Sequence, residues 1–174
     1  MRQRAALPLP VVSQGAELLV QGYLMRRNIL AYRAPPNNEG YDLICIHPDP
    51  RANTKLVRVQ VKSRYQTDCD RCFPIREESF GAFDYLVAVF LNIGYYYKKR
   101  VDSESGRSEP EFYTLPVEFV KEHHIKTKAW EKIRVKGREV EYFRNDAGFE
   151  LIATDLGIPY PSREAMGEES TAHP

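Results

Sequence analysis

The amino-acid sequence predicts an α/β protein in which a mixed central sheet is flanked by helices. In residues 55–63, valines alternate with polar side chains, which predicts a strand that buries one face. Residues 84–91 are almost continuously apolar, as expected of a central strand covered on both faces. Residues 14–28 carry apolar side chains at helical spacing, which predicts an amphipathic helix ahead of the strands.

Turn residues separate the other elements of the N-terminal half. Proline, asparagine and glycine in residues 35–40 divide two short strands, at 28–33 and 41–47. The second of these is expected to pair antiparallel with the strand at 55–63, through a polar connector. The predicted order is therefore helix, strand, strand, strand, an irregular polar segment, and then the buried strand.

The C-terminal part has weaker patterns. We expect a strand at 111–115, then a helix that begins at Pro116 and runs to about residue 125. Residues 130–135 and 138–143 suggest the two arms of a hairpin around a glycine. Residues 149–156 fit either a strand or a short helix.

The 174 residues fit one domain with a full-sized core. We divide the chain into a core with an N-terminal lead-in (1–125), a C-terminal accessory hairpin or extension (126–160), and a disordered tail (161–174). The tail is assigned as disordered because it carries little apolar content.

Composition limits the classes of protein that this chain can represent. The net charge of +1 gives no global basic field, although a local basic patch stays possible. No apolar run approaches the roughly 20 residues that span a membrane. Three cysteines, an odd number, do not make a secreted disulfide framework. We therefore expect a cytoplasmic protein with reduced thiols and no membrane partner.

Polar side chains collect on two adjacent predicted strands. Gln60 and Lys62 lie on the face of their strand opposite the valines, and Asp42 stands at the start of the preceding apolar run. Burying such groups without partners is costly. A carboxylate and a carbonyl oxygen can hold a hard cation, and a lysine can meet a phosphate, which favours a functional site. The alternative is an ordinary exposed strand face with Gln60 and Lys62 in water.

This arrangement resembles the PD-(D/E)xK nuclease superfamily, near the branch of archaeal Holliday-junction resolvases and intron-encoded endonucleases. The resemblance covers roughly residues 13–92. It implies a restriction-endonuclease-like fold and a bound Mg²⁺ or Mn²⁺. It also implies that Asp42 is the principal metal ligand and Gln60 the second, with Glu17 of the upstream helix as an accessory acid. Lys62 would be the catalytic lysine, which orients or deprotonates the attacking water or stabilises the pentavalent phosphate.

The chain departs from the superfamily motif at two positions. Tyr41 stands where the motif has proline, and Gln60 stands where it has Asp or Glu. The second departure removes one negative charge from the site. An amide oxygen can still ligate magnesium, and with Asp42 and Glu17 present the charge is expected to suffice.

Two further features border the predicted site. Cys69 and Cys72 form a C-x-x-C pair, but zinc needs about four ligands and no second ligand pair has the usual spacing. Two free thiols in a loop are the favoured interpretation, and a Zn²⁺ site the disfavoured one.

Clustered cations and tyrosines suggest contacts with nucleic acid, through phosphate pairing and base stacking. The candidate contact residues are Arg58, Arg64, Tyr96, Lys98, Lys99 and Arg100. The alternative for the last four is an amphipathic strand with its tyrosines packed inward.

Taken together, the sequence predicts a Mg²⁺- or Mn²⁺-dependent endonuclease that hydrolyses phosphodiester bonds in DNA, and the resemblance implies a possible homodimer. The first alternative is a catalytically silent nuclease-fold domain that binds nucleic acid or a protein partner, motivated by Gln60. The second is a zinc-stabilised binding module built on Cys69 and Cys72.

Overall fold

The computed structural model describes residues 11–36, 38–95 and 105–161. The predicted contacts Tyr96, Lys98, Lys99 and Arg100 lie outside these residues, as does the predicted tail from residue 162 onward.

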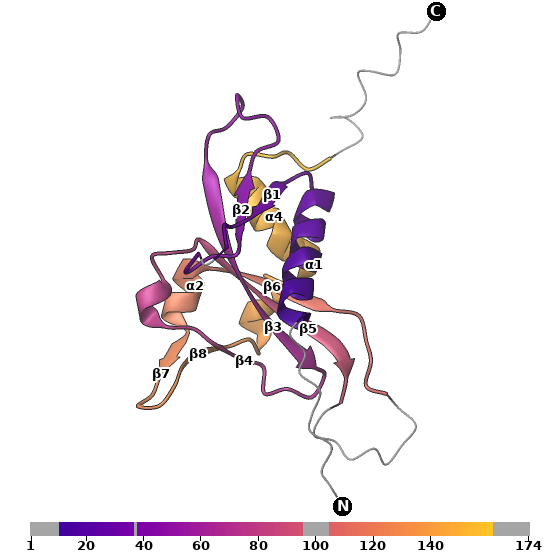
Figure 1. Ribbon diagram of the computed structural model, residues 1–174, viewed down its shortest axis with the longest axis vertical. Coiled ribbons are helices and arrows are strands. Elements are labelled where there is room, and N and C mark those ends of the chain that lie inside the picture. Colours follow the sequence, from indigo (N-terminus) through magenta and orange to yellow (C-terminus); the bar gives the residue numbers. More distant parts are fainter. Residues whose placement is uncertain (1–10, 37, 96–104, 162–174) are drawn as a thin grey trace, which may run out of the picture.

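A five-stranded mixed sheet forms the centre of the molecule (Figure 1). Its strands β3 and β5 are parallel neighbours, and every other pair in the sheet is antiparallel. In spatial order the strands are β1 (Leu30–Arg33), β2 (Leu43–Ile46), β3 (Leu56–Gln66), β5 (Tyr85–Gly94) and β6 (Glu111–Pro116). The predicted α/β class and mixed sheet are confirmed.

One face of the central sheet is covered by two helices, α1 (Val12–Arg26) and α4 (Asn145–Asp155). The apolar side of α1 meets the alternating valines of β3, of which Val57 and Val59 are buried. Arg27 joins the two helices through an ion pair with Glu150, with Nε 2.6 Å from Oε2. Burial of this face is the main source of hydrophobic stabilisation for the N-terminal helix.

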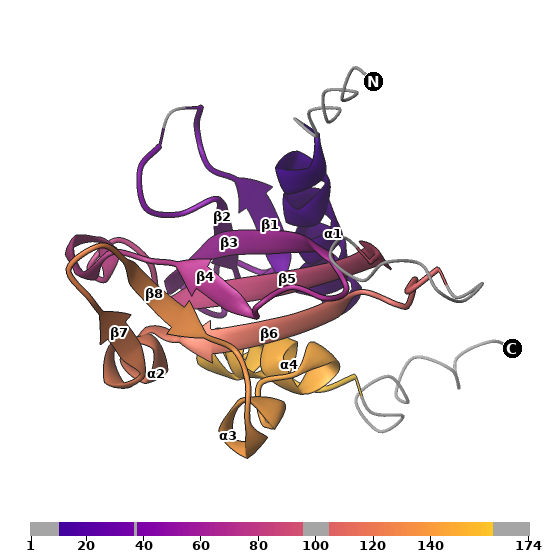
Figure 2. The same cartoon turned by 90° about the horizontal axis from the view of Figure 1, so that it is seen from below.

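The opposite face is covered by a second, three-stranded sheet and two short helices (Figure 2). Residues 85–90 of β5 are all buried because both faces of the central sheet are covered, as the apolar run predicted. The second sheet has the order β4 (Cys72–Pro74), β8 (Glu131–Arg134) and β7 (His124–Lys126), and the helices are α2 (Val117–Glu122) and α3 (Arg138–Glu141). A single 3₁₀ turn, η1 (Glu77–Ser79), follows β4.

The hairpin predicted for residues 130–135 and 138–143 is wrong. Strand β8 pairs instead with β7 and with β4, and residues 138–141 form the helical turn α3. Gly137 has φ +109° and redirects the chain, so that Val140 packs into the same apolar cluster as Ile133. The helix predicted to reach residue 125 ends at Glu122.

The segment 149–156, which fitted either element, is helical as part of α4. Its apolar residues Phe149 and Ile152 are buried in the cluster under α1. The segment 126–160 thus contributes side chains to both apolar clusters, while its division from the core at residue 125 stays a prediction. Among the described residues, no helix is both long and apolar enough to cross a membrane.

Candidate active site

Strands β2 and β3 bring Asp42 and Gln60 together. The register pairs Leu43 with Val59, so Asp42 falls opposite Gln60 at the start of β2. The Asp42 amide donates to the Val59 carbonyl at 2.8 Å, and its Oδ2 accepts the Val61 amide at 2.6 Å. Opposed residues of an antiparallel pair share a face, and the next residue of β3 on that face is Lys62. The register therefore brings Asp42, Gln60 and Lys62 to one face of the sheet, and their roles in a site stay a prediction.

The Asp42 carboxyl lies in a partly buried setting. Burial raises its pKa above the ordinary value, and the Val61 amide, Lys62 and Arg33 oppose that rise. The net rise means that the positive charges nearby do not fully compensate the desolvated carboxylate. A bound cation would supply the missing compensation.

Gln60 has a buried oxygen without a partner. Its Oε1 makes no hydrogen bond to any of the described residues, although it is shielded from solvent. Most buried polar atoms in folded proteins are satisfied, so a buried oxygen without a protein partner is a candidate to bind a ligand, an ion or a water. A carboxylate and an amide oxygen on facing strands suit a hard cation such as Mg²⁺, and the residues present thus fit the predicted metal.

A groove of about 520 Å³ opens in front of Gln60 and Lys62. The central sheet contributes one wall, and the second sheet contributes the other through the end of β4, the η1 turn and the β7–β8 turn. The lining residues are Gly40, Gln60, Lys62, Pro74, Ile75, Arg76, Ser79, Thr127, Lys128, Ala129, Trp130 and Glu131. The groove gives an extended ligand access to Lys62.

Gly40 shapes the approach to Asp42. Its φ of +101° is rarely adopted by other residues, and a Cβ at this position would collide with the side chain of Ala82. The glycine that the sequence pattern treats as a simple turn residue therefore also permits a close approach of two loops beside the groove.

Glu17, the predicted accessory acid, is held by Arg33. Its Oε2 lies 3.1 Å from Arg33 Nη2, and its side chain is largely shielded from solvent. The positive charge of Arg33 also opposes the rise in the pKa of Asp42, so this one arginine interacts with both acids. Sequence analysis missed Arg33 as a site residue, because nothing in the pattern of β1 shows what its last residue faces.

The predicted nucleic-acid contacts Arg58 and Arg64 have intramolecular partners. The Arg58 guanidinium binds both carboxylate oxygens of Asp84, at 3.2 and 3.0 Å, and the Gly81 carbonyl at 3.0 Å. Arg64 donates twice to the Cys72 carbonyl, at 3.0 and 2.7 Å. Both arginines therefore tie β3 to neighbouring segments, and their contact with nucleic acid stays a prediction.

The cysteine pair gains no further ligands in the part of the chain that the structure describes. Cys69 and Cys72 are free thiols, with Cys72 buried at the start of β4. No three His, Cys, Asp or Glu side chains gather as a metal site within residues 11–36, 38–95 and 105–161. Asp42 and Gln60 do not count as such a cluster, because the second oxygen donor is the amide of a glutamine.

Sequence analysis also missed the far wall of the groove. Arg76, Lys128 and Trp130 line it, yet they come from two segments that are far apart in the chain. A lone tryptophan between charged residues, in K-A-W-E-K, was the available signal.

The fold is similar to those of two solved nucleases. The bacterial homing endonuclease I-Ssp6803I superposes with a TM-score of 0.51 at 17% identity, over 95% of this chain and 100% of that chain. The Holliday junction resolvase Hjc of Archaeoglobus fulgidus gives a TM-score of 0.43 at 12% identity, over 85% of this chain and 98% of that one. No protein-family model and no curated protein matches the sequence. The likeness to the homing endonuclease shows that the chain has a restriction-endonuclease-like fold, with a mixed central sheet flanked by helices, as the sequence predicted.

Proposed function

We propose that this protein is a Mg²⁺- or Mn²⁺-dependent endonuclease that hydrolyses phosphodiester bonds in DNA. The observation that carries the proposal is the buried, unpaired Oε1 of Gln60 opposite the Asp42 carboxylate, on the strand that presents Lys62 to the groove. The homing endonuclease with the same fold supports the choice of DNA. A homodimer remains an expectation from the resemblance.

Each residue has a distinct part in the proposed reaction. Asp42 and Gln60 would hold the cation, with Glu17 as an accessory acid once it is released from Arg33. The cation would polarise a phosphoryl oxygen and lower the pKa of bound water. Lys62 would donate hydrogen bonds to the phosphate as negative charge develops, in a position fixed by β3 before the substrate arrives.

Cleavage assays with wild-type protein and Lys62→Ala test the proposal. Linear duplex, single-stranded and four-way-junction DNA would be incubated with Mg²⁺, Mn²⁺ or EDTA. We expect metal-dependent cutting by wild type and a loss of about 100- to 1,000-fold in Lys62→Ala, the usual effect of removing one preorganised donor. Lys121→Ala is the matched control, because Lys121 lies on α2 in an exposed pair with Glu118.

Equal background cutting by wild type and Lys62→Ala, on every substrate and with every metal, would refute the nuclease proposal. That result would favour the silent nuclease-fold domain, for which the pairing of Glu17 with Arg33 and the neutral Gln60 are the supporting features. Gel-shift measurements with the same DNAs would then be the next step.

A further inference from the structure

One aromatic side chain, Trp130, is among the lining residues of the groove. Trp130 is 64% exposed, although it belongs to the turn between β7 and β8 that lines the groove with Gln60 and Lys62. An exposed indole in a groove lining offers a large, flat apolar surface to a ligand. Trp130 is also the one tryptophan of the chain.

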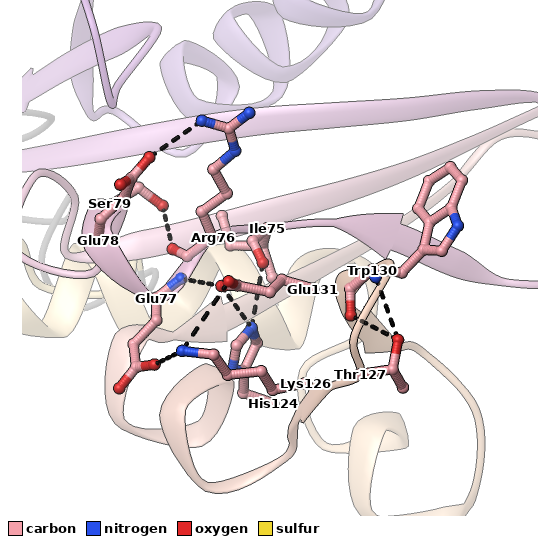
Figure 3. Close-up of polar contacts among 10 residues, drawn as sticks. All are labelled: Ile75, Arg76, Glu77, Glu78, Ser79, His124, Lys126, Thr127, Trp130 and Glu131. Atoms are coloured by element: carbon pink, nitrogen blue, oxygen red, sulfur yellow. Dashed lines mark hydrogen bonds and ion pairs between the residues drawn. The ribbon is translucent and has the colours of Figure 1, made fainter.

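The turn that carries Trp130 is held in a fixed shape. The Trp130 carbonyl accepts hydrogen bonds from the Thr127 amide at 2.9 Å and from Thr127 Oγ1 at 3.0 Å. The Trp130 amide in turn donates to Thr127 Oγ1 at 3.1 Å. These bonds use the backbone of the turn and leave the indole to project from it (Figure 3).

A network of charged groups braces this turn against the η1 turn. Glu131 Oε2 accepts the Glu77 amide at 2.7 Å, and Lys126 Nζ lies 2.6 Å from Glu77 Oε2. His124 Nε2 lies 3.1 Å from the Ile75 carbonyl and 3.7 Å from Glu131. The two segments of the far wall are therefore linked, and the indole of Trp130 and the guanidinium of Arg76 extend to the same side of that network (Figure 3).

The charges of the groove favour a polyanion. Three cations, Lys62, Arg76 and Lys128, line it against one acidic lining residue, Glu131. Arg76 is paired with Glu78 at 3.1 Å in an exposed ion pair, and Glu131 accepts the Glu77 amide. Cationic side chains along a groove suit the phosphates of a nucleic-acid backbone, and an aromatic ring beside them suits the face of a base.

We propose that Trp130 is a stacking platform for an unpaired base of the DNA whose backbone passes Lys62. The inference rests on the proposed function and narrows its substrate class to DNA with single-stranded or unstacked nucleotides next to the cleaved phosphate. In an intact duplex the faces of the bases are covered by their neighbours, so a ring on a hairpin turn has no base face to contact. Single-stranded, gapped or branched DNA offers such a face.

The single tryptophan allows a direct test that needs no cleavage. Wild-type protein in EDTA would be titrated with a short single-stranded oligonucleotide, a gapped duplex and an intact blunt duplex, while Trp130 fluorescence and the anisotropy of a labelled DNA are followed together. We expect the single-stranded and gapped DNAs to quench Trp130, and the intact duplex to bind more weakly without quenching.

Substitutions give the second readout. We expect Trp130→Ala to weaken single-strand binding by about 5- to 150-fold, the range for loss of one stacked base, and Trp130→Phe to retain most of the affinity. Tyr142→Ala is the control, because Tyr142 is an 80% exposed aromatic outside the groove lining.

The outcomes separate the two proposals. Binding seen by anisotropy without a change in Trp130 fluorescence, equal quenching by intact duplex, or unchanged affinity of Trp130→Ala would each overturn the stacking proposal. Cleavage that depends on Lys62 would leave the proposed function intact in those cases. No binding and no cleavage with any of the DNAs would refute both.

Discussion

Gln60→Met is expected to stabilise the folded protein and to abolish its activity at the same time. The change replaces the buried amide oxygen, which has no partner among the described residues, with an apolar group of similar length. An unsatisfied buried polar atom costs about 1 to 3 kcal/mol in the free energy of unfolding. For a domain of this size, 1 kcal/mol corresponds to a change in Tm of roughly 2 to 4 °C. We therefore expect Gln60→Met to raise the Tm in EDTA by roughly 2 to 12 °C, while it abolishes cation-dependent cleavage.

Gln21→Met is a control with the same chemical change and the opposite expectation. Gln21 Nε2 donates to the Ala31 carbonyl at 2.8 Å, so the substitution removes a made hydrogen bond. The net value of such a bond is about 0.5 to 1.5 kcal/mol, and we expect the Tm of Gln21→Met to fall. Thermal unfolding followed by circular dichroism measures both variants.

The response to Mg²⁺ gives a second signature of the same residue. A cation at ten times its dissociation constant stabilises the folded state by about 1.4 kcal/mol, roughly 3 to 6 °C in Tm. We expect this rise in wild type, a rise at least as large in Gln60→Glu, whose carboxylate restores the missing charge, and none in Gln60→Met.

A Gln60→Met protein that melts below wild type in EDTA would show that Oε1 is satisfied in solution. Retention of the Mg²⁺ response by that variant would show that Gln60 is no ligand. Either result refutes the reasoning from the orphan oxygen.

Three other perturbations address the charge and the packing around the site. Burial raises the pKa of Asp42, so the folded wild type loses stability as pH rises through that raised pKa, whereas an asparagine does not titrate. Asp42→Asn should therefore gain Tm relative to wild type in EDTA as pH rises above the ordinary carboxyl pKa of about 4. Burial works against the Asp84 carboxylate, yet the bonds from Arg58 outweigh it and hold the pKa of Asp84 below its usual value. Asp84→Asn should therefore lose about 1 to 2 kcal/mol in urea unfolding at neutral pH, with a difference from wild type that shrinks in acid as wild type loses the pair. Phe149→Ala should lose about 3 to 5 kcal/mol by the same measurement, because the 2% exposed ring packs with Tyr23 under α1, and a loss below 1 kcal/mol would support an accessory role for residues 126–160.

Local patterns in the sequence determined the centre of the fold. The alternation of Val57, Val59 and Val61 with polar residues fixes which face of β3 is buried, because side chains of a strand alternate at every residue. The same alternation places Gln60 and Lys62 on one face, and the short connector makes β2 the antiparallel partner that brings Asp42 opposite Gln60. The core of the candidate site could therefore be predicted from a stretch of about two strands.

Only the tertiary structure decided what faces that site. Strand β4 pairs Pro74 with Lys132 of β8, so two segments far apart in the chain form the far wall of the groove. The partner of a short strand depends on which distant segment reaches it and which apolar face remains to be covered, and neither is encoded in local periodicity. For the same reason the sequence could identify Glu17 as a helix acid but not its ion pair with Arg33. It could likewise identify Trp130 as a residue of a predicted hairpin, but not as a residue that lines the groove. Thus the sequence determined the strand that carries Gln60 and Lys62, whereas long-range packing of the second sheet decided the surface that a substrate would meet.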